Sequence, residues 1–196
     1  MPNTIRDGKG RGYQAAVNSK NQLSTRATAV EQRLKSAIDG HYYETTSGVV
    51  TLTDTAETGI IYLKNDTTIP NYVLVIDRVF YDTWTSTGGS GADGTLRYYK
   101  NPTVTGGTDI VPTNTSFSAI AGASGTFKKS VTSIDTGTVW WSAYLTDKSS
   151  TALEEGRIVL QSGYSFAISV AAPTGNTSMK VAINVAFYYL DTTLLD

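Results

Sequence analysis

Apolar and polar residues alternate along most of the chain after residue 40, with the period of two that is typical of a half-buried β-strand. The alternation is clearest over 179–190, where Val181, Ile183, Val185 and Phe187 alternate with Lys180, Ala182, Asn184 and Ala186. The same pattern predicts strands over the ranges 41–45, 48–53, 58–65, 72–83, 94–100, 125–134, 137–146, 156–161, 164–171 and 179–190.

These strands are separated by Gly-, Ser- and Pro-containing turns, and no long helix stands between them. Without a strand–helix–strand rhythm, antiparallel sheets packed as two layers are expected. The last three strands are joined by Ser162-Gly163 and by the polar turn PTGNTS, an ending typical of jelly-roll domains. The predicted fold class is therefore all-β, an antiparallel jelly-roll-like β-sandwich with an extended basic N-terminal arm.

The core of this sandwich is expected to consist of apolar residues from several of the predicted strands. We predict burial of Val73, Val75, Val79, Tyr81, Ile158, Leu160, Phe166, Ile168, Val181, Ile183, Val185 and Phe187.

The first 40 residues show a different pattern. Residues 1–22, in which Gly8, Gly10 and Gly12 alternate with Lys9 and Arg11, offer too little apolar area to order themselves alone, so an extended arm is expected. In residues 23–38, Val30, Leu34 and Ile38 form a helical stripe. This stretch is either a short helix or more arm that becomes ordered on a partner. We therefore divide the chain into an arm over 1–40 and a body over 41–196.

Charge follows the same division, although the net charge is only −1. Residues 1–38 hold seven basic and two acidic residues, a balance of +5, and residues 39–196 hold nine basic and fifteen acidic, a balance of −6. Such a split indicates that the two parts contact different partners. The arm residues predicted to bind a partner are Ile5, Arg6, Lys9, Arg11, Tyr13, Val17 and Lys20.

Composition narrows the candidate chemistry. The 30 Thr, 18 Ser and 12 Tyr favour strands, and the absence of Cys excludes disulfides and thiolate metal sites. His41 is the only histidine, which excludes a multi-His metal centre. No apolar run is long enough for a membrane span, and no secretory signal is evident, so synthesis in the cytoplasm is expected.

No catalytic set is evident either. The segment IRDGKGRG lacks the spacing of a phosphate-binding loop, the carboxylates are scattered, and the GxSxG motif is absent. We expect a protein that is not an enzyme and that holds no cofactor or metal. Specific nucleic-acid binding is not expected, because only Tyr13 is interleaved with the basic residues of the arm.

The aromatic residues fit two roles. Adjacent aromatics on a strand point to opposite faces, so one ring of each pair is expected in the core and the other at a subunit interface. The alternative is a platform on which sugar rings stack. The candidate interface aromatics are Trp84, Tyr98, Trp140 and Trp141.

Four segments carry a resemblance to a known group of proteins. They are IRDGKGRGYQAAVNSKNQL (5–23), GHYYETTSGVVTLT (40–53), IIYLKND (60–66) and KNPTVTGGT (100–108). In these segments the chain resembles virion structural proteins of tailed bacteriophages. The resemblance carries over no functional residue, because such proteins act through surfaces.

The resemblance implies a capsid decoration, or cement, protein on the outer surface of the virion, made in the host cytoplasm. Such a protein would bind the major capsid protein across seams of the shell and stabilise the head. A homo-oligomer is expected, with a trimer favoured because closed rings leave no sticky surface unpaired. The alternative is a tail- or fibre-associated part, either structural or binding a glycan receptor.

Overall fold

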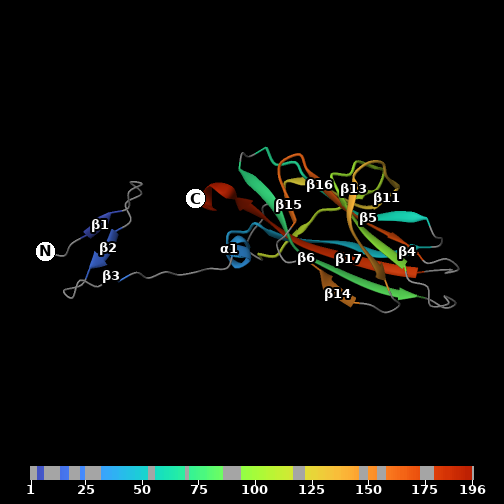
Figure 1. Ribbon diagram of the computed structural model, residues 1–196, viewed down its shortest axis with the longest axis horizontal. Coiled ribbons are helices and arrows are strands. Elements are labelled where there is room, and N and C mark those ends of the chain that lie inside the picture. The colour runs from blue at the N-terminus through green and yellow to red at the C-terminus, as the bar shows by residue number, and fades with distance from the viewer. Residues whose placement is uncertain are drawn as a thin grey trace. The chain divides into compact units, whose positions relative to one another are not determined.

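The computed structural model describes most of the chain in two compact units, Met1–Glu31 and Gln32–Asp196 (Figure 1). The residues described are 4–6, 14–17, 23–24, 32–52, 56–68, 71–85, 94–116, 122–145, 150–153, 158–172 and 179–195.

The first unit contains a small antiparallel sheet. Strands β1 (Thr4–Arg6), β2 (Gln14–Val17) and β3 (Leu23–Ser24) pair in the order β1-β2-β3. These segments of the predicted arm are extended strands whose backbone groups pair with one another, which supplies hydrogen bonds that a single isolated strand would lack.

The second unit begins with helix α1 (Gln32–Ile38), so the helical part of 23–38 is shorter than its apolar stripe and belongs to the body. The helix lies beside β4 and β17 and buries Ser36, whereas Leu34 and Ile38 are 53% and 69% exposed. Leu34 and Ile38 of the expected stripe thus face away from the sheet, whereas Val30 lies outside the described residues.

The body is built from strands and one short 3₁₀-helix after α1. They are β4 (Tyr42–Leu52), β5 (Glu57–Asn65), β6 (Tyr72–Thr85), β7 (Gly94–Lys100), β8 (Val104–Thr105), β9 (Thr108–Asp109), β10 (Thr113–Asn114), β11 (Gly125–Val131), β12 (Ser133–Ile134), β13 (Thr138–Leu145), β14 (Ser150–Leu153), β15 (Ile158–Leu160), β16 (Ser165–Ala171), β17 (Met179–Asp191) and η1 (Thr192–Leu195).

Two six-stranded antiparallel sheets form the body (Figure 1). The first sheet has the order β10-β4-β17-β6-β14, and β15 also pairs with β6. The second sheet has the order β13-β7-β16-β5-β11-β9, and β8 pairs with β12 in a separate ribbon. One apolar cluster joins residues of both sheets, which places the core between them.

The pairing is nested. β7 pairs with β13, β6 with β14 and β15, β5 with β16, and β4 with β17, so the second half of the chain returns along the first in reverse order. This rolled hairpin is the connectivity of a jelly roll. Strands β8–β12 form an insertion between β7 and β13. The predicted all-β, antiparallel jelly-roll-like sandwich is confirmed.

All twelve predicted core residues are buried, but they do not all share one cluster. Leu74 and Ile76 point between the sheets, so their neighbours Val73 and Val75 lie on the outer face of the first sheet. There they pack with Tyr188 in a second, smaller cluster. The body is therefore apolar on parts of both faces of the first sheet.

The two predicted strands 41–45 and 48–53 form the single strand β4, interrupted by a bulge. Ala182 pairs with Val49 and Asn184 with Thr46, so Ser47 and Gly48 together oppose Ile183. Gly48 has a φ of 64°, which glycine adopts at little cost, and Ser47 Oγ accepts a hydrogen bond of 2.9 Å from the Ile183 backbone N–H.

We predict that Ile183→Ala lowers the free energy of unfolding by about 2–5 kcal/mol, because the substitution leaves a cavity in a fully buried site while the backbone bond to Ser47 is retained. Urea denaturation measures this loss. Val49→Ala, at an exposed site on β4, is the control and should change stability by less than about 0.5 kcal/mol. A loss that small for Ile183→Ala would show that β17 does not anchor the core.

Candidate interaction surface

The arm residues predicted to bind a partner are only partly within the described chain. Ile5 and Arg6 lie in β1, where Ile5 pairs with Ala15, and Val17 lies in β2, where it pairs with Leu23. The others, Lys9, Arg11, Tyr13 and Lys20, lie outside the described residues.

Two exposed aromatic residues and an exposed valine lie together on β13, an edge strand of the second sheet. Val139, Trp140 and Tyr144 are all exposed, Tyr144 to 76%. The eight residues TVWWSAYL contain no charge, and natural sheets usually protect exposed edges with lysine, proline or short strands. An uncharged edge with large exposed side chains is a candidate surface for contact with another chain.

A bulge in β13 changes the expected alternation of its two tryptophans. Val139 pairs with Tyr99 and Trp141 with Tyr98, so Trp140 is the extra residue. The ring centroid of Trp140 lies 5.9 Å from that of Tyr98, and the ring centroid of Trp141 lies 4.7 Å from that of Tyr98. Trp141 therefore packs on the core while Trp140 remains at its rim, 45% exposed.

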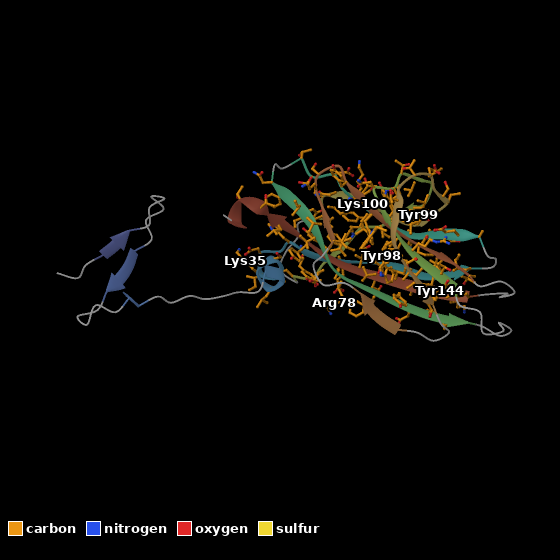
Figure 2. All side chains as sticks on the ribbon, viewed as in Figure 1. Lys35, Arg78, Tyr98, Tyr99, Lys100 and Tyr144 are labelled. Atoms are coloured by element: carbon orange, nitrogen blue, oxygen red, sulfur yellow. The ribbon has the colours of Figure 1, made fainter. Side chains whose placement is uncertain are left out.

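Tyr98 was wrongly expected at an interface. It is 1% exposed and packs edge-on against Phe166 at 5.2 Å, and Figure 2 shows it in the middle of the body. Tyr98 is buried because it lies on the inward face of β7 together with Leu96. Its neighbour Tyr99 takes the outward face.

In the remaining aromatic pairs one ring is expected inside and the other outside, and the pair Tyr188–Tyr189 is an exception. Trp84 is half-buried near the end of β6, opposite Lys180 in the first sheet, so it does not share a sheet with Trp140 and Trp141. Both residues of the pair Tyr188–Tyr189 are buried, because the outward ring of Tyr188 stacks on Tyr42 at 6.2 Å.

A carboxylate network beside β13 escaped the sequence analysis. Glu57 on β5 accepts hydrogen bonds of 2.5 Å from Arg97 Nη1 and from the Tyr99 hydroxyl, both on β7, and a further one from the Ser169 hydroxyl on β16. Tyr99 is opposite Val139 in β13, so the network borders the exposed edge. The only sequence signal for this network is that Arg97 and Tyr99 occupy outward positions of the same predicted strand.

The network sets the protonation of its members. Burial raises the pKa of Glu57, but the bonds from Ser169, Tyr99 and Arg97 outweigh it and hold the pKa below its usual value. Burial and the bond to Glu57 raise the pKa of Tyr99 above its ordinary value. The arrangement therefore keeps a charged carboxylate and a neutral phenol, which suits a structural tie between three strands.

A second tie lies on the outer face of the first sheet. The Tyr42 hydroxyl donates a 2.7 Å hydrogen bond to Asp77, which is buried, and the Arg78 guanidinium lies 3.9 Å from the same carboxylate. Burial and the bond to Asp77 raise the pKa of Tyr42 well above its usual range. The bond links β4 to β6 across the intervening β17.

Within the described residues, no group of three or more His, Cys, Asp or Glu side chains is placed to hold a metal ion. No helix in that part of the chain is long and apolar enough to cross a membrane. Comparison of the chain with protein-family models, with curated proteins and with solved structures finds no match. The candidate surface is thus defined by its own geometry, the β13 edge and the network beside it.

We predict that the Glu57 network stabilises the fold at neutral pH and that this contribution disappears in acid. Because the folded-state pKa of Glu57 is depressed, the contribution is complete above the unfolded-state value of about 4.5 and is lost as the pH falls through the folded-state value. Urea midpoints of wild type and Glu57→Gln should differ at pH 7 and converge on acidification. Tyr99→Phe removes one bond and should give a smaller difference. A constant difference between wild type and Glu57→Gln would contradict this account.

Proposed function

We propose that the chain is a structural protein of a tailed-bacteriophage virion, a decoration or cement protein that binds the major capsid protein across seams and stabilises the head. The observation that carries the proposal is a jelly-roll body in which an edge strand, β13, is uncharged and aromatic. Jelly rolls recur in viral coats. Because a fold alone does not determine function, the exposed edge is the stronger support.

The β13 edge suits contact between subunits. Tyr and Trp are enriched at the centres of protein interfaces, where they bury large areas. Tyr144, which is 76% exposed, supplies such a ring, and Val139 extends the surface toward the Glu57 network. We therefore place self-association, as a trimer, at this edge.

The first unit suits attachment to the shell. Met1–Glu31 is compact by itself and carries five basic and two acidic residues, whereas the body is acidic. Its positive charge would be attracted to an acidic shell surface. The proposed role is not catalytic.

The physical benefit comes from many copies. A chain bound on both sides of a seam resists its opening, because separation of the shell subunits would break contacts on both sides. Linked sites also gain effective concentration, so many weak contacts add to a strong restraint.

We predict that the purified protein is a trimer by light scattering and that Tyr144→Lys shifts it toward monomer, because a charge on the edge opposes close pairing. Val49→Lys, an exposed valine of the opposite sheet, is the matched control and should leave the trimer intact. Wild type that stays monomeric at high concentration, or a trimer insensitive to Tyr144→Lys, would place the subunit contact elsewhere.

We also predict that deleting residues 1–31 leaves the body folded and lowers its occupancy on particles at least tenfold, about 1.4 kcal/mol per site. All strands from β4 to β17 remain in the truncated chain. Occupancy is measured on particles that lack the native protein, with circular dichroism as the control for folding. Full occupancy of the truncated chain would assign attachment to the body.

A further inference from the structure

Two cavities lie on either side of Tyr164, the residue that precedes β16. The smaller, of about 230 Å³, is lined by Trp140, by Lys100 and by the three residues of β15 among others. The larger, of about 420 Å³, is lined by residues including Tyr62, Lys64 and Val104. They share Asn101, Tyr164 and Ser165, so they form one interrupted groove.

Two aromatic rings line the smaller cavity and remain accessible. Trp140 and Tyr164 are 45% and 46% exposed, although each ring is large enough to be covered by neighbouring side chains. Val159, which also lines it, is exposed as well. An accessible flat ring at a cavity wall suits a ligand that has an apolar face of similar size.

The polar groups of the cavity are donors. Lys100 is the only charged residue among its lining residues, and no ion pair of Lys100 is found within the described chain. Lys64, in the larger cavity, is instead paired with Asp66 at 2.7 Å. Asn101 uses its side-chain oxygen to accept a bond from Ser165 N–H, which leaves its Nδ2 group as a donor. A ligand with a carboxylate and hydroxyl groups matches this set.

The wall between the cavities is held in place by several hydrogen bonds. Tyr164 N–H donates to Gln161 O at 3.1 Å, Gly163 N–H to Asn65 O at 2.7 Å, and Asn65 N–H to Tyr164 O at 3.0 Å. Asn65 is fully buried, and its side chain also donates to Leu160 O at 2.9 Å. A site fixed in this way avoids much of the ordering cost of binding.

Asn101, on the other side of the groove, is fixed as well. Its backbone N–H donates to Ser165 O at 2.9 Å, and its φ of 51° lies in the left-handed region that asparagine tolerates. Ser165 in turn donates its hydroxyl to Pro102 O at 2.7 Å. Both walls of the groove are therefore preorganised, because these hydrogen bonds continue the pairing of β16 with β5 and β7.

We propose that this groove binds an acidic saccharide, with one carboxylated pyranose ring in the smaller cavity. The C–H face of the ring stacks on Trp140 or Tyr164, its carboxylate pairs with Lys100, and a hydroxyl accepts a bond from Asn101. The saccharide chain continues past Tyr164 into the larger cavity. This activity goes beyond the proposed structural role and is tested on the isolated protein, so either can fail without the other.

The test uses two matched pairs of probes and the full-length chain. Sialyllactose is compared with lactose, and trigalacturonate with its methyl ester, by calorimetry. At least one acidic probe should bind with a Kd on the order of 1 mM, and its neutral counterpart at least about tenfold more weakly. Failure of both acidic probes to bind, or equal binding of acid and neutral forms, would overturn the proposal.

Substitutions in the groove test whether the saccharide binds there. Trp140→Ala, Tyr164→Ala and Lys100→Gln should each weaken binding at least about tenfold, and Trp140→Phe should retain most of it because a ring remains. Tyr164 lies outside β13, so its variant separates saccharide binding from self-association. The matched control is Phe80→Ala. Phe80 is an exposed ring that does not line the groove, and the Arg78 guanidinium lies 5.2 Å from its centroid. Loss in Lys100→Gln alone, or equal loss in Phe80→Ala, would contradict a stacked ring in this cavity.

Discussion

The pairing of β17 with two strands at once is the interaction on which the rest of the structure depends. β17 hydrogen bonds to β4 along one side and to β6 along the other, while Val181, Ile183, Val185 and Phe187 fill the space between the sheets. Because β4 and β17 are the first and last strands of the body, their pairing closes the roll. The remaining pairs, β5 with β16 and β7 with β13, follow inside it.

The nested pairing also explains where the polar side chains lie. A buried carboxylate is costly without a partner, and Asp77 has one in the Tyr42 hydroxyl, which donates to it across β17. On the other sheet the more exposed Glu57 accepts hydrogen bonds from residues of β7 and β16. These ties stiffen the faces of the sheets. The edge at β13 has no such charged group, which leaves it as the surface suited to another chain.

The sequence predicted the parts of the fold that depend on local alternation. Inward residues of β16 and β17 were identified because their neighbours differ in polarity, and the jelly-roll class followed from the rhythm of strands and turns. Alternation could not reveal a bulge, so the roles of Trp140 and Trp141 were not foreseen and β4 was divided in two. It also could not show that Tyr98 faces inward, since its neighbour Tyr99 is equally apolar.

The candidate sites were less predictable because they join residues far apart in the chain. Glu57 lies 40 residues from Arg97 and 112 from Ser169, and the groove beside Tyr164 depends on the approach of Asn65 and Asn101 to one turn. Such contacts follow from the register of the pairs, which the sequence does not display. The exposed stripe of α1 was missed for a similar reason, because the strand faces that the helix covers were unknown.

The central claim is that this jelly roll decorates a phage head and binds across its seams. The most direct measurement is electron cryomicroscopy of virions that contain the protein. Virions that lack the protein are imaged in the same way, and the density that differs between the two gives its position. The account predicts density for the jelly-roll body on the outer capsid surface, spanning contacts between major capsid subunits. Density confined to the tail, or no difference between the two kinds of particle, would contradict it.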